Sequence, residues 1–159
     1  MSKLTSREME FLKESNAIEG VYDYNSLVQA IEAWKYLKTQ KEMNPGVVLK
    51  THKILMLHQP LMPDERGYFR KVPVWIGANY GIDWKIIPER IDIWCKNAWL
   101  WPQRWKEHHI QYEKIHGFVD GNGRTGRMFM NWQRLKAKLP IYIVHAGEEQ
   151  MEYYKWFEV

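Results

Sequence analysis

The most informative stretch of this sequence is His116-Gly117-Phe118-Val119-Asp120-Gly121-Asn122-Gly123-Arg124-Thr125-Gly126-Arg127. Glycines on both sides of Asn122 allow the backbone to turn tightly, so that successive N–H groups can point the same way and form an anion-binding nest. A helix is expected to begin directly afterwards, near Gly123, and its first N–H groups favour a phosphate. The turn is therefore predicted to cradle phosphate.

Charged and titratable side chains surround this turn. Arg124 and Arg127 are three residues apart, so on a helix both guanidinium groups reach one face and can clamp a polyphosphate. Asp120 offers a hard oxygen ligand for Mg²⁺ that also bridges phosphates. His116 lies on the other side of the turn, where a neutral imidazole could take a proton from an attacking hydroxyl. Together these groups indicate a phosphoryl-type transfer.

The same glycines also fit another pattern. Residues 121–126 match G-x-G-x-x-G, which in dinucleotide-binding folds requires a preceding strand inside a βαβ unit. Residues 108–115 have the character of a helix instead, and no βαβ alternation occurs elsewhere. A dinucleotide fold and a purely structural turn are therefore disfavoured.

Helical periodicity dominates the rest of the chain. The expected helices cover residues 6–18, a segment capped by Asn25, residues 45–58 opened by Pro45, the region between Pro88 and His116, and residues 123–140 ended by Pro140. Their expected inward positions are Met9, Leu12, Ile18, Leu27, Val28, Ile31, Trp34, Leu37, Ile91, Trp94, Cys95, Ala98, Trp105, His109, Tyr112, Met128, Trp132, Leu135 and Leu139. Residues 68–77 are aromatic and β-branched, which predicts a short exposed hairpin with Pro73 at its edge.

Composition narrows the class of protein without deciding its function. The 159 residues, 45% hydrophobic and 26% charged, predict one domain with a real core, to which nine tryptophans contribute. No run of about 18 apolar residues is present, so no membrane span is expected. The charged N-terminus lacks a signal peptide, and the lone Cys95, expected to be a buried hydrophobe, suits a cytoplasmic protein. The charge of +4 is scattered along the chain, so nucleic-acid binding is not indicated.

Residues 116–127 resemble the signature loop of the Fic family, His-Pro-Phe-x-Asp/Glu-Gly-Asn-Gly-Arg-x-x-Arg. Gly117 replaces the usual proline, which leaves the loop before Phe118 less rigid and affects rate more than reaction type. The resemblance implies an all-α, Fic-like helical bundle with one short β-hairpin, and a single domain over residues 1–159. It also implies transfer of AMP from ATP to a serine, threonine or tyrosine hydroxyl of a target protein, including self-modification.

The resemblance assigns roles to the residues of the loop. His116 is implied as general base, Phe118 as an anchor in the core and Asp120 as the Mg²⁺ ligand. The α-phosphate is implied to lie on Gly121, Asn122 and Gly123. The β- and γ-phosphates are implied to lie on Arg124 and Arg127.

Two further segments are similar to the same family. The hairpin resembles the flap that holds a target segment by strand addition, which implies docking along Val72, Val74 and Ile76. Ser15-Asn16-Ala17-Ile18-Glu19-Gly20 resembles the inhibitory Ser/Thr-x-x-x-Glu-Gly/Asn motif, so residues 1–22 are implied to form an inhibitory segment. Ser15 and Glu19 lie one helical turn apart, and Glu19 is implied to form a salt bridge with Arg127 that removes the grip on the γ-phosphate.

Two alternatives remain beside adenylyl transfer. The same fold could remove AMP or transfer another phosphate-containing group, although the run Asp120-Gly121-Asn122-Gly123 favours the AMP version. The other alternative is a non-catalytic basic binding module, which only Gly117 supports.

Overall fold

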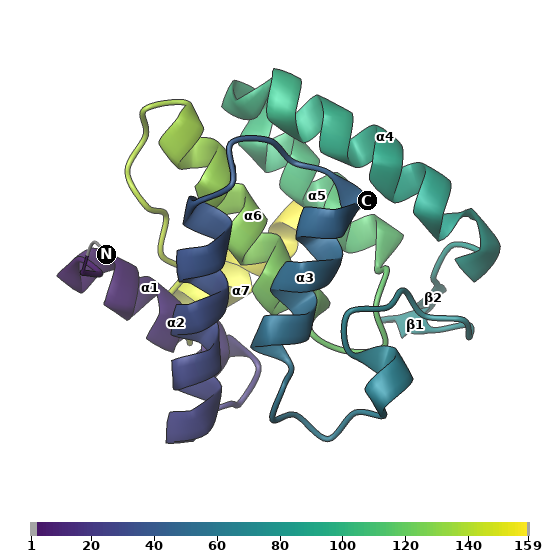
Figure 1. Ribbon diagram of the computed structural model, residues 1–159, viewed down its shortest axis with the longest axis horizontal. Helices are drawn as coiled ribbons and strands as arrows, with labels where there is room; N and C mark the ends of the chain where they lie inside the picture. Colours follow the sequence, from purple (N-terminus) through teal and green to yellow (C-terminus); the bar gives the residue numbers. More distant parts are fainter. Residues whose placement is uncertain (1–2, 159) are drawn as a thin grey trace.

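The computed structural model describes residues 3–158, which fold mainly into helices (Figure 1). The α-helices are α1 (Ser6–Ile18), α2 (Tyr24–Lys38), α3 (Pro45–Leu55), α4 (Ile87–Leu100), α5 (Trp105–Ile115), α6 (Asn122–Lys136) and α7 (Glu148–Tyr154). The strands are β1 (Trp75–Ile76) and β2 (Asn79–Tyr80), and the 3₁₀ helices are η1 (Pro63–Glu65), η2 (Trp84–Ile86), η3 (Pro102–Arg104) and η4 (Lys155–Phe157). The prediction of a helical bundle with one short hairpin is confirmed.

Helix α6 lies at the centre of the bundle, in contact with α1, α2, α3 and α5 (Figure 1). All of its residues from Arg124 to Arg134 are buried. A helix that is buried on every side is the core of a fold rather than part of its surface. The other helices therefore pack around the helix that begins at the glycine-rich turn.

The polar side chains in the second half of α6 bind the segment that follows the helix. Asn131 donates to the carbonyl of Tyr142 at 3.0 Å and accepts from its N–H at 2.7 Å. The Nε of Arg134 donates to the carbonyl of Pro140 at 2.9 Å. Gln133 pairs with the ring of His108 at 2.6 Å. Buried polar groups need such partners, and the bonds from Asn131 and Arg134 hold residues 140–142 against the core.

Helix α1 is attached to α2 through one buried carboxylate. Glu8 completes a capping box with Thr5 at the start of α1. Its Oε2 accepts a hydrogen bond from Trp34 Nε1 at 2.6 Å and an ion pair from Lys38 at 2.7 Å. Because Glu8 and Trp34 are both buried, this contact determines how α1 lies across the bundle.

Two expected helix boundaries are wrong. The cap of α2 is Asp23, which accepts from the N–H of Ser26 at 3.0 Å, and not Asn25, which lies inside the first turn. Helix α3 begins at Pro45 as expected but ends at Leu55, before residue 58. Arg66 reaches back to the carbonyls of Met56 and Gln59, so the chain there is bound without a further helical turn.

The end of α6 also differs from the prediction. The helix stops at Lys136, because Lys138 adopts a left-handed φ of 65° and the N–H of Leu139 bonds back to the carbonyl of Arg134 at 2.8 Å. Leu135 and Leu139 are consequently 39% and 37% exposed and do not belong to the core. The short helix α7, with its acidic first turn, was not predicted.

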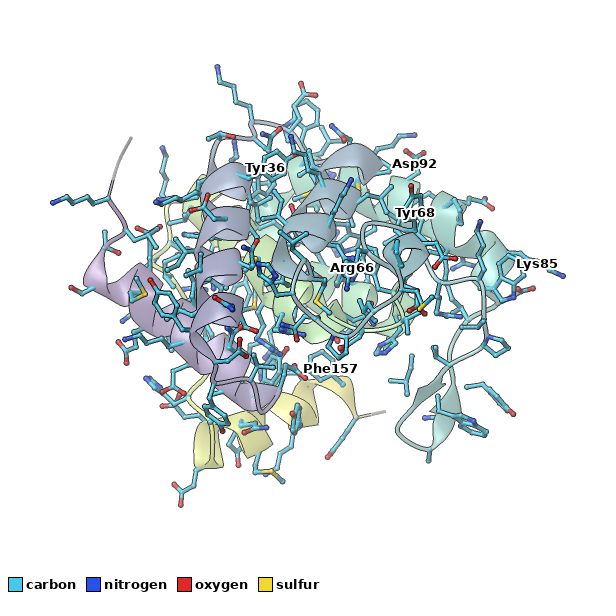
Figure 2. The ribbon with its side chains drawn as sticks, turned by 60° about the horizontal axis from the view of Figure 1, so that its bottom comes forward. Tyr36, Arg66, Tyr68, Lys85, Asp92 and Phe157 are labelled. Carbon is cyan, nitrogen blue, oxygen red and sulfur yellow. The ribbon has the colours of Figure 1, made fainter. Side chains whose placement is uncertain are left out.

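The hairpin lies later in the chain than expected. Its turn is at Gly77, with a left-handed φ of 60°, so the two strands pair over residues 75–80 and Pro73 precedes them. Trp75 and Tyr80 face each other across the pair and stack with ring centroids 3.7 Å apart. Figure 2 shows the hairpin projecting away from the helices.

Two smaller expectations concern the burial of Cys95 and the presence of a membrane-spanning helix. Cys95 is 1% exposed, and burial raises the pKa of its thiol to about 12, so it is a small buried hydrophobe as predicted. Within residues 3–158, every helix is too short or too polar to cross a membrane.

The role of Glu8 can be tested by replacing it with alanine. Glu8→Ala removes the cap of α1 and leaves the buried indole N–H of Trp34 without an acceptor, so the free energy of unfolding should fall by about 2–4 kcal/mol. Urea denaturation followed by circular dichroism measures the loss. The matched control is Glu32→Ala, an exposed position within α2, which should change stability by less than about 0.5 kcal/mol. Equal effects of the two variants would contradict the assignment.

Candidate functional site

The glycine-rich turn connects α5 to α6. Helix α5 ends at Ile115, His116 adopts the left-handed conformation (φ 47°, ψ 59°), and α6 begins at Asn122 after Gly121, whose φ is 87°. Phe118 is fully buried, and its ring stacks on that of His52 at 3.7 Å. The turn therefore lies where the sequence predicts it, anchored in the core through Phe118.

Asn122 staples the turn with its side chain. Its Oδ1 accepts from the N–H of Phe118 at 2.9 Å, and its Nδ2 donates to the carbonyl of Phe118 at 2.8 Å. Both ends of the amide are committed to the loop. Asn122 can therefore contact a phosphate only through its own backbone N–H.

His52, on α3, holds the other side of the turn. Its Nδ1 accepts from the N–H of Gly67 at 3.0 Å, so Nε2 carries the proton and donates to the carbonyl of Asp120 at 2.8 Å. Burial lowers the pKa of His52 to about 4, which keeps the ring neutral. Sequence reasoning missed this residue, since its partners are 15 and 68 residues away and no local pattern marks it.

The start of α6 presents free backbone donors. The N–H of Gly121 bonds to Asp120 Oδ1 at 2.8 Å, and no described side chain caps the helix. The N–H groups of residues 122–124 belong to the first turn of α6, where helical partners are missing. An uncapped helix start with these amides is suited to an anion.

Arg124 adds a buried and only partly paired guanidinium to this helix start. Its side chain is 3% exposed, and its Nε and Nη1 atoms have no hydrogen-bond partner among the described residues. Its Nη2 lies 3.5 Å from the sulfur of Met56 and 3.9 Å from Asp120 Oδ2. Buried donors without partners are rare, so this guanidinium is arranged for a ligand with several acceptor oxygens.

Arg127 is held by helix α1. Its Nε donates to Ser15 Oγ at 2.8 Å, and its Nη2 donates to the carbonyl of Ser15 at 3.0 Å and to Glu19 Oε1 at 2.8 Å. The salt bridge expected between Glu19 and Arg127 is therefore present. The Glu19 carboxylate also lies against Gly123, where an added Cβ would be 2.5 Å from Oε1.

His116 opens onto a cavity of about 720 Å³. The cavity is lined by Glu19, Ile76, Gly77, Asn79, Tyr80, Ile82, Glu113, Lys114, His116, Gly123, Arg127, Tyr153, Tyr154, Phe157 and Glu158. Its walls thus come from the ends of α1 and α5, from α6, from the hairpin and from the C-terminal segment that carries Phe157 (Figure 2). His116 and Arg127 therefore face the same space.

The surroundings of the His116 imidazole favour its neutral form. Burial lowers its pKa below the usual 6.5, and the positive charge of Arg70 acts in the same direction. Asp120, Glu19 and the nearby carbonyl of Glu113 oppose this shift, although the buried Nδ1 has no hydrogen-bond partner among the described residues. A neutral imidazole at neutral pH is what a general base requires.

The hairpin residues are only partly brought to the site. Ile76 lines the cavity, whereas Val72 is 49% exposed and Val74 is half-buried, and both precede strand β1. Asp120 lies at the other end of the turn, with a side chain that is 58% exposed.

The described residues contain no group of three or more metal-ligating side chains. Asp120 alone nonetheless fits Mg²⁺, which commonly binds through one or two carboxylates together with substrate phosphates.

Comparison with known proteins gives a consistent result. The model of the Fic/DOC family matches residues 48–133. The chain is 28% identical to protein adenylyltransferase Fic of Drosophila virilis and 27% identical to that of Drosophila grimshawi, in each case over 93% of this chain and 33% of the relative. The chain thus spans about a third of the length of these curated relatives.

Solved structures with the same fold include Fic-1 from C. elegans and a Fic domain containing signaling protein from Bacteroides thetaiotaomicron. The first has a TM-score of 0.77 at 18% identity and covers 96% of this chain and 55% of its own. The second has a TM-score of 0.77 at 15% identity and covers 92% of this chain and 69% of its own. At these identities the likeness supports the helical fold.

Two glycines of the turn should respond oppositely to alanine. At Gly117 an added Cβ would make ordinary contacts with Ile87 and Phe69, at 3.4 and 3.5 Å, and φ is not left-handed. Gly117→Ala should therefore raise stability by about 0.4–1 kcal/mol, or about 1–4 °C in Tm. At Gly121 the left-handed φ and a Cβ only 2.8 Å from the Met56 sulfur predict a loss of about 1–3 kcal/mol. Thermal unfolding of both variants checks the pair, and a stable Gly121→Ala protein would disprove this account of the turn.

Proposed function

We propose that this chain, which belongs to the Fic/DOC family, transfers AMP from ATP to a hydroxyl side chain of a protein. The observation that carries the proposal is the buried guanidinium of Arg124 at the uncapped start of α6, whose Nε and Nη1 have no partner among the described residues and which lies close to the neutral His116. An anion site beside a base suits attack by a hydroxyl on a phosphate ester. The relatives named protein adenylyltransferase support ATP as the substrate.

The proposed reaction needs one proton transfer and one displacement at phosphorus. His116 accepts the proton of the target hydroxyl while the oxygen of that hydroxyl attacks the α-phosphorus. The bond from this phosphorus to the α,β-bridging oxygen breaks, pyrophosphate leaves, and AMP remains as an ester on the target. The backbone N–H groups of residues 122–124 would hold oxygens of the α-phosphate, and Arg124 and Arg127 those of the β- and γ-phosphates. Asp120 would hold Mg²⁺, which when bound offsets the negative charge of the phosphates.

The target segment is proposed to dock along the hairpin. Ile76 already lines the cavity, and the short β1–β2 pair has an unpaired outer edge that can accept an extended peptide. Strand addition there would bring a target hydroxyl to the side of the cavity on which His116 lies. Segments of this same chain are also proposed as substrates in self-modification.

Glu19 is proposed to inhibit this activity. Its carboxylate neutralises Arg127 and lies against Gly123, where the terminal phosphate of ATP would need the same guanidinium. Ser15 holds the guanidinium from the other side through two hydrogen bonds. ATP could then bind only without the contact between its γ-phosphate and the Arg127 guanidinium, in a pose that does not lead to transfer.

Removal of Glu19 should release the activity. The Glu19→Gly protein incubated with ATP and Mg²⁺ should gain the mass of AMP, on itself or on a target, at a rate at least about 10-fold above the parent. Intact-protein mass spectrometry measures this gain. Adding His116→Ala should abolish it, and Glu42→Gly, which changes an exposed glutamate in the bend between α2 and α3, should behave as the parent. Failure of Glu19→Gly to transfer AMP while it still binds ATP would count against the proposal.

Removal of AMP is the second candidate, because the side chain of Glu19 is 37% exposed and lines the cavity, where its carboxylate could orient a water. A target already carrying AMP separates the two directions. Hydrolysis by the parent that disappears in Glu19→Gly would favour removal.

Transfer by Glu19→Gly should depend on pH through His116. Because burial lowers the pKa of this imidazole, the ring stays neutral at pH 7 and protonates only as the pH falls below 6.5. Glu19 is one of the groups that raise this pKa, so its removal shifts the midpoint further down. The rate should therefore fall toward acid with a midpoint below pH 6.5, in initial rates at saturating ATP. A midpoint at or above 6.5 would exclude His116 as the base.

A further inference from the structure

We infer that Arg70 is a positioning residue that ties both arms of the β1–β2 hairpin to the backbone of His116. Its guanidinium thereby keeps a segment docked on the hairpin in register with the base. The inference rests on the proposed function for its meaning in catalysis, whereas the structural link stands on contacts within the chain.

The guanidinium of Arg70 joins three segments at one point. Its Nε donates to the carbonyl of His116 at 2.7 Å, Nη1 to that of Val72 at 2.9 Å and Nη2 to that of Ile82 at 2.9 Å. The backbone N–H of Arg70 donates to the carbonyl of Gly117 at 2.9 Å. The residue is 2% exposed, so these bonds are shielded from water.

The two hairpin contacts fix both arms at once. Val72 precedes strand β1, and Ile82 follows strand β2, so one planar group bonds the chain where it enters and where it leaves the hairpin. Gly81 packs directly on the guanidinium, since an added Cβ would lie 3.0 Å from Nη2. Only arginine offers donors in such a fixed fork, because the lysine ammonium is a single point.

The third contact restrains the catalytic turn. His116 adopts a left-handed φ of 47°, an uncommon conformation for a residue with a side chain, and Gly117 follows it with a flexible backbone. Arg70 binds the carbonyls of both residues. The rigidity that a proline would give this position is thus replaced by hydrogen bonds from a distant residue.

Arg70 also contributes its charge. No carboxylate among the described residues lies within ion-pair distance of it, and its partners are carbonyls. Its positive charge lowers the pKa of His116, while Asp120 and Glu19 raise it.

The test compares substitutions at Arg70 with the same substitutions at Arg90, an exposed residue of α4. In the Glu19→Gly protein, Arg70→Lys should keep a positive charge but lose the fork, so the transfer rate at saturating ATP should fall about 10- to 100-fold. Arg70→Gln should lose at least as much. Arg90→Lys and Arg90→Gln should leave the rate unchanged.

Two readouts do not depend on transfer. Hydrogen exchange of residues 72–82 should accelerate in both Arg70 variants and not in the Arg90 variants. The NMR titration of the His116 ring, assigned as the signal missing from His116→Ala, should move to higher pH in Arg70→Gln and less in Arg70→Lys.

A variant at a second residue, Gly81, keeps the inference testable if the Arg70 variants do not fold. Gly81→Ala leaves Arg70 in place but pushes on its Nη2 and on Val74, so the hairpin should exchange faster and transfer should slow while the fold is kept. Hairpin exchange and His116 titration equal to those of the Arg90 variants would overturn the inference. Both readouts could change as expected while none of the variants transfers AMP, not even the one that carries Glu19→Gly alone. In that case the proposed function fails and the structural link through Arg70 stands.

Discussion

The structure depends on a central helix that buries charged side chains. Helix α6 lies inside the bundle, yet it carries Arg124, Arg127 and Arg134 among its buried residues. Because burial of an arginine without partners is costly, each guanidinium restricts what packs against it. Arg134 bonds the chain that follows α6 and Arg127 bonds α1, whereas among these three arginines only Arg124 has buried nitrogen atoms without a partner in the described part of the chain. The arginines in the middle and C-terminal part of the helix are therefore bound to neighbouring segments, and the one nearest its N-terminal end is open to a ligand.

The turn before α6 obtains its shape from residues far away in the sequence. His52 on α3 holds the carbonyl of Asp120, and Arg70 holds those of His116 and Gly117. Asn122 acts from within the turn, through the backbone of Phe118, and Asp120 accepts from the N–H of Gly121. A left-handed histidine next to a glycine would otherwise sample several conformations. A rigid site thus results from a flexible sequence, because its neighbours supply the restraints.

The parts of the fold that were predictable are local in the sequence. The helical spacing of apolar residues located α1 to α6, and the contiguous motif at 116–127 located the turn, its arginines and His116. Errors arose where the decisive partner is distant or the local signal is weak. The end of α6, the pairing of the hairpin at 75–80 and the acidic α7 belong to this class. His52 and Arg70 were missed for the same reason, although a lone arginine inside an aromatic stretch was a visible sign of a buried polar contact.

Gly123 links the resting and the working arrangements of this protein. The carboxylate of Glu19 lies where a side chain on residue 123 would have to be, and the backbone of that residue belongs to the start of α6. Any larger residue would displace Glu19 and would also obstruct an approaching phosphate. Under the proposed function, the Glu19 carboxylate and a bound phosphate would both need the space that the missing side chain of Gly123 leaves open. A substitution at residue 123 would therefore change both arrangements at once, whereas substitutions in helix α1, which Glu8 ties to Trp34 and Lys38 of α2, could shift Glu19 and leave the start of α6 intact.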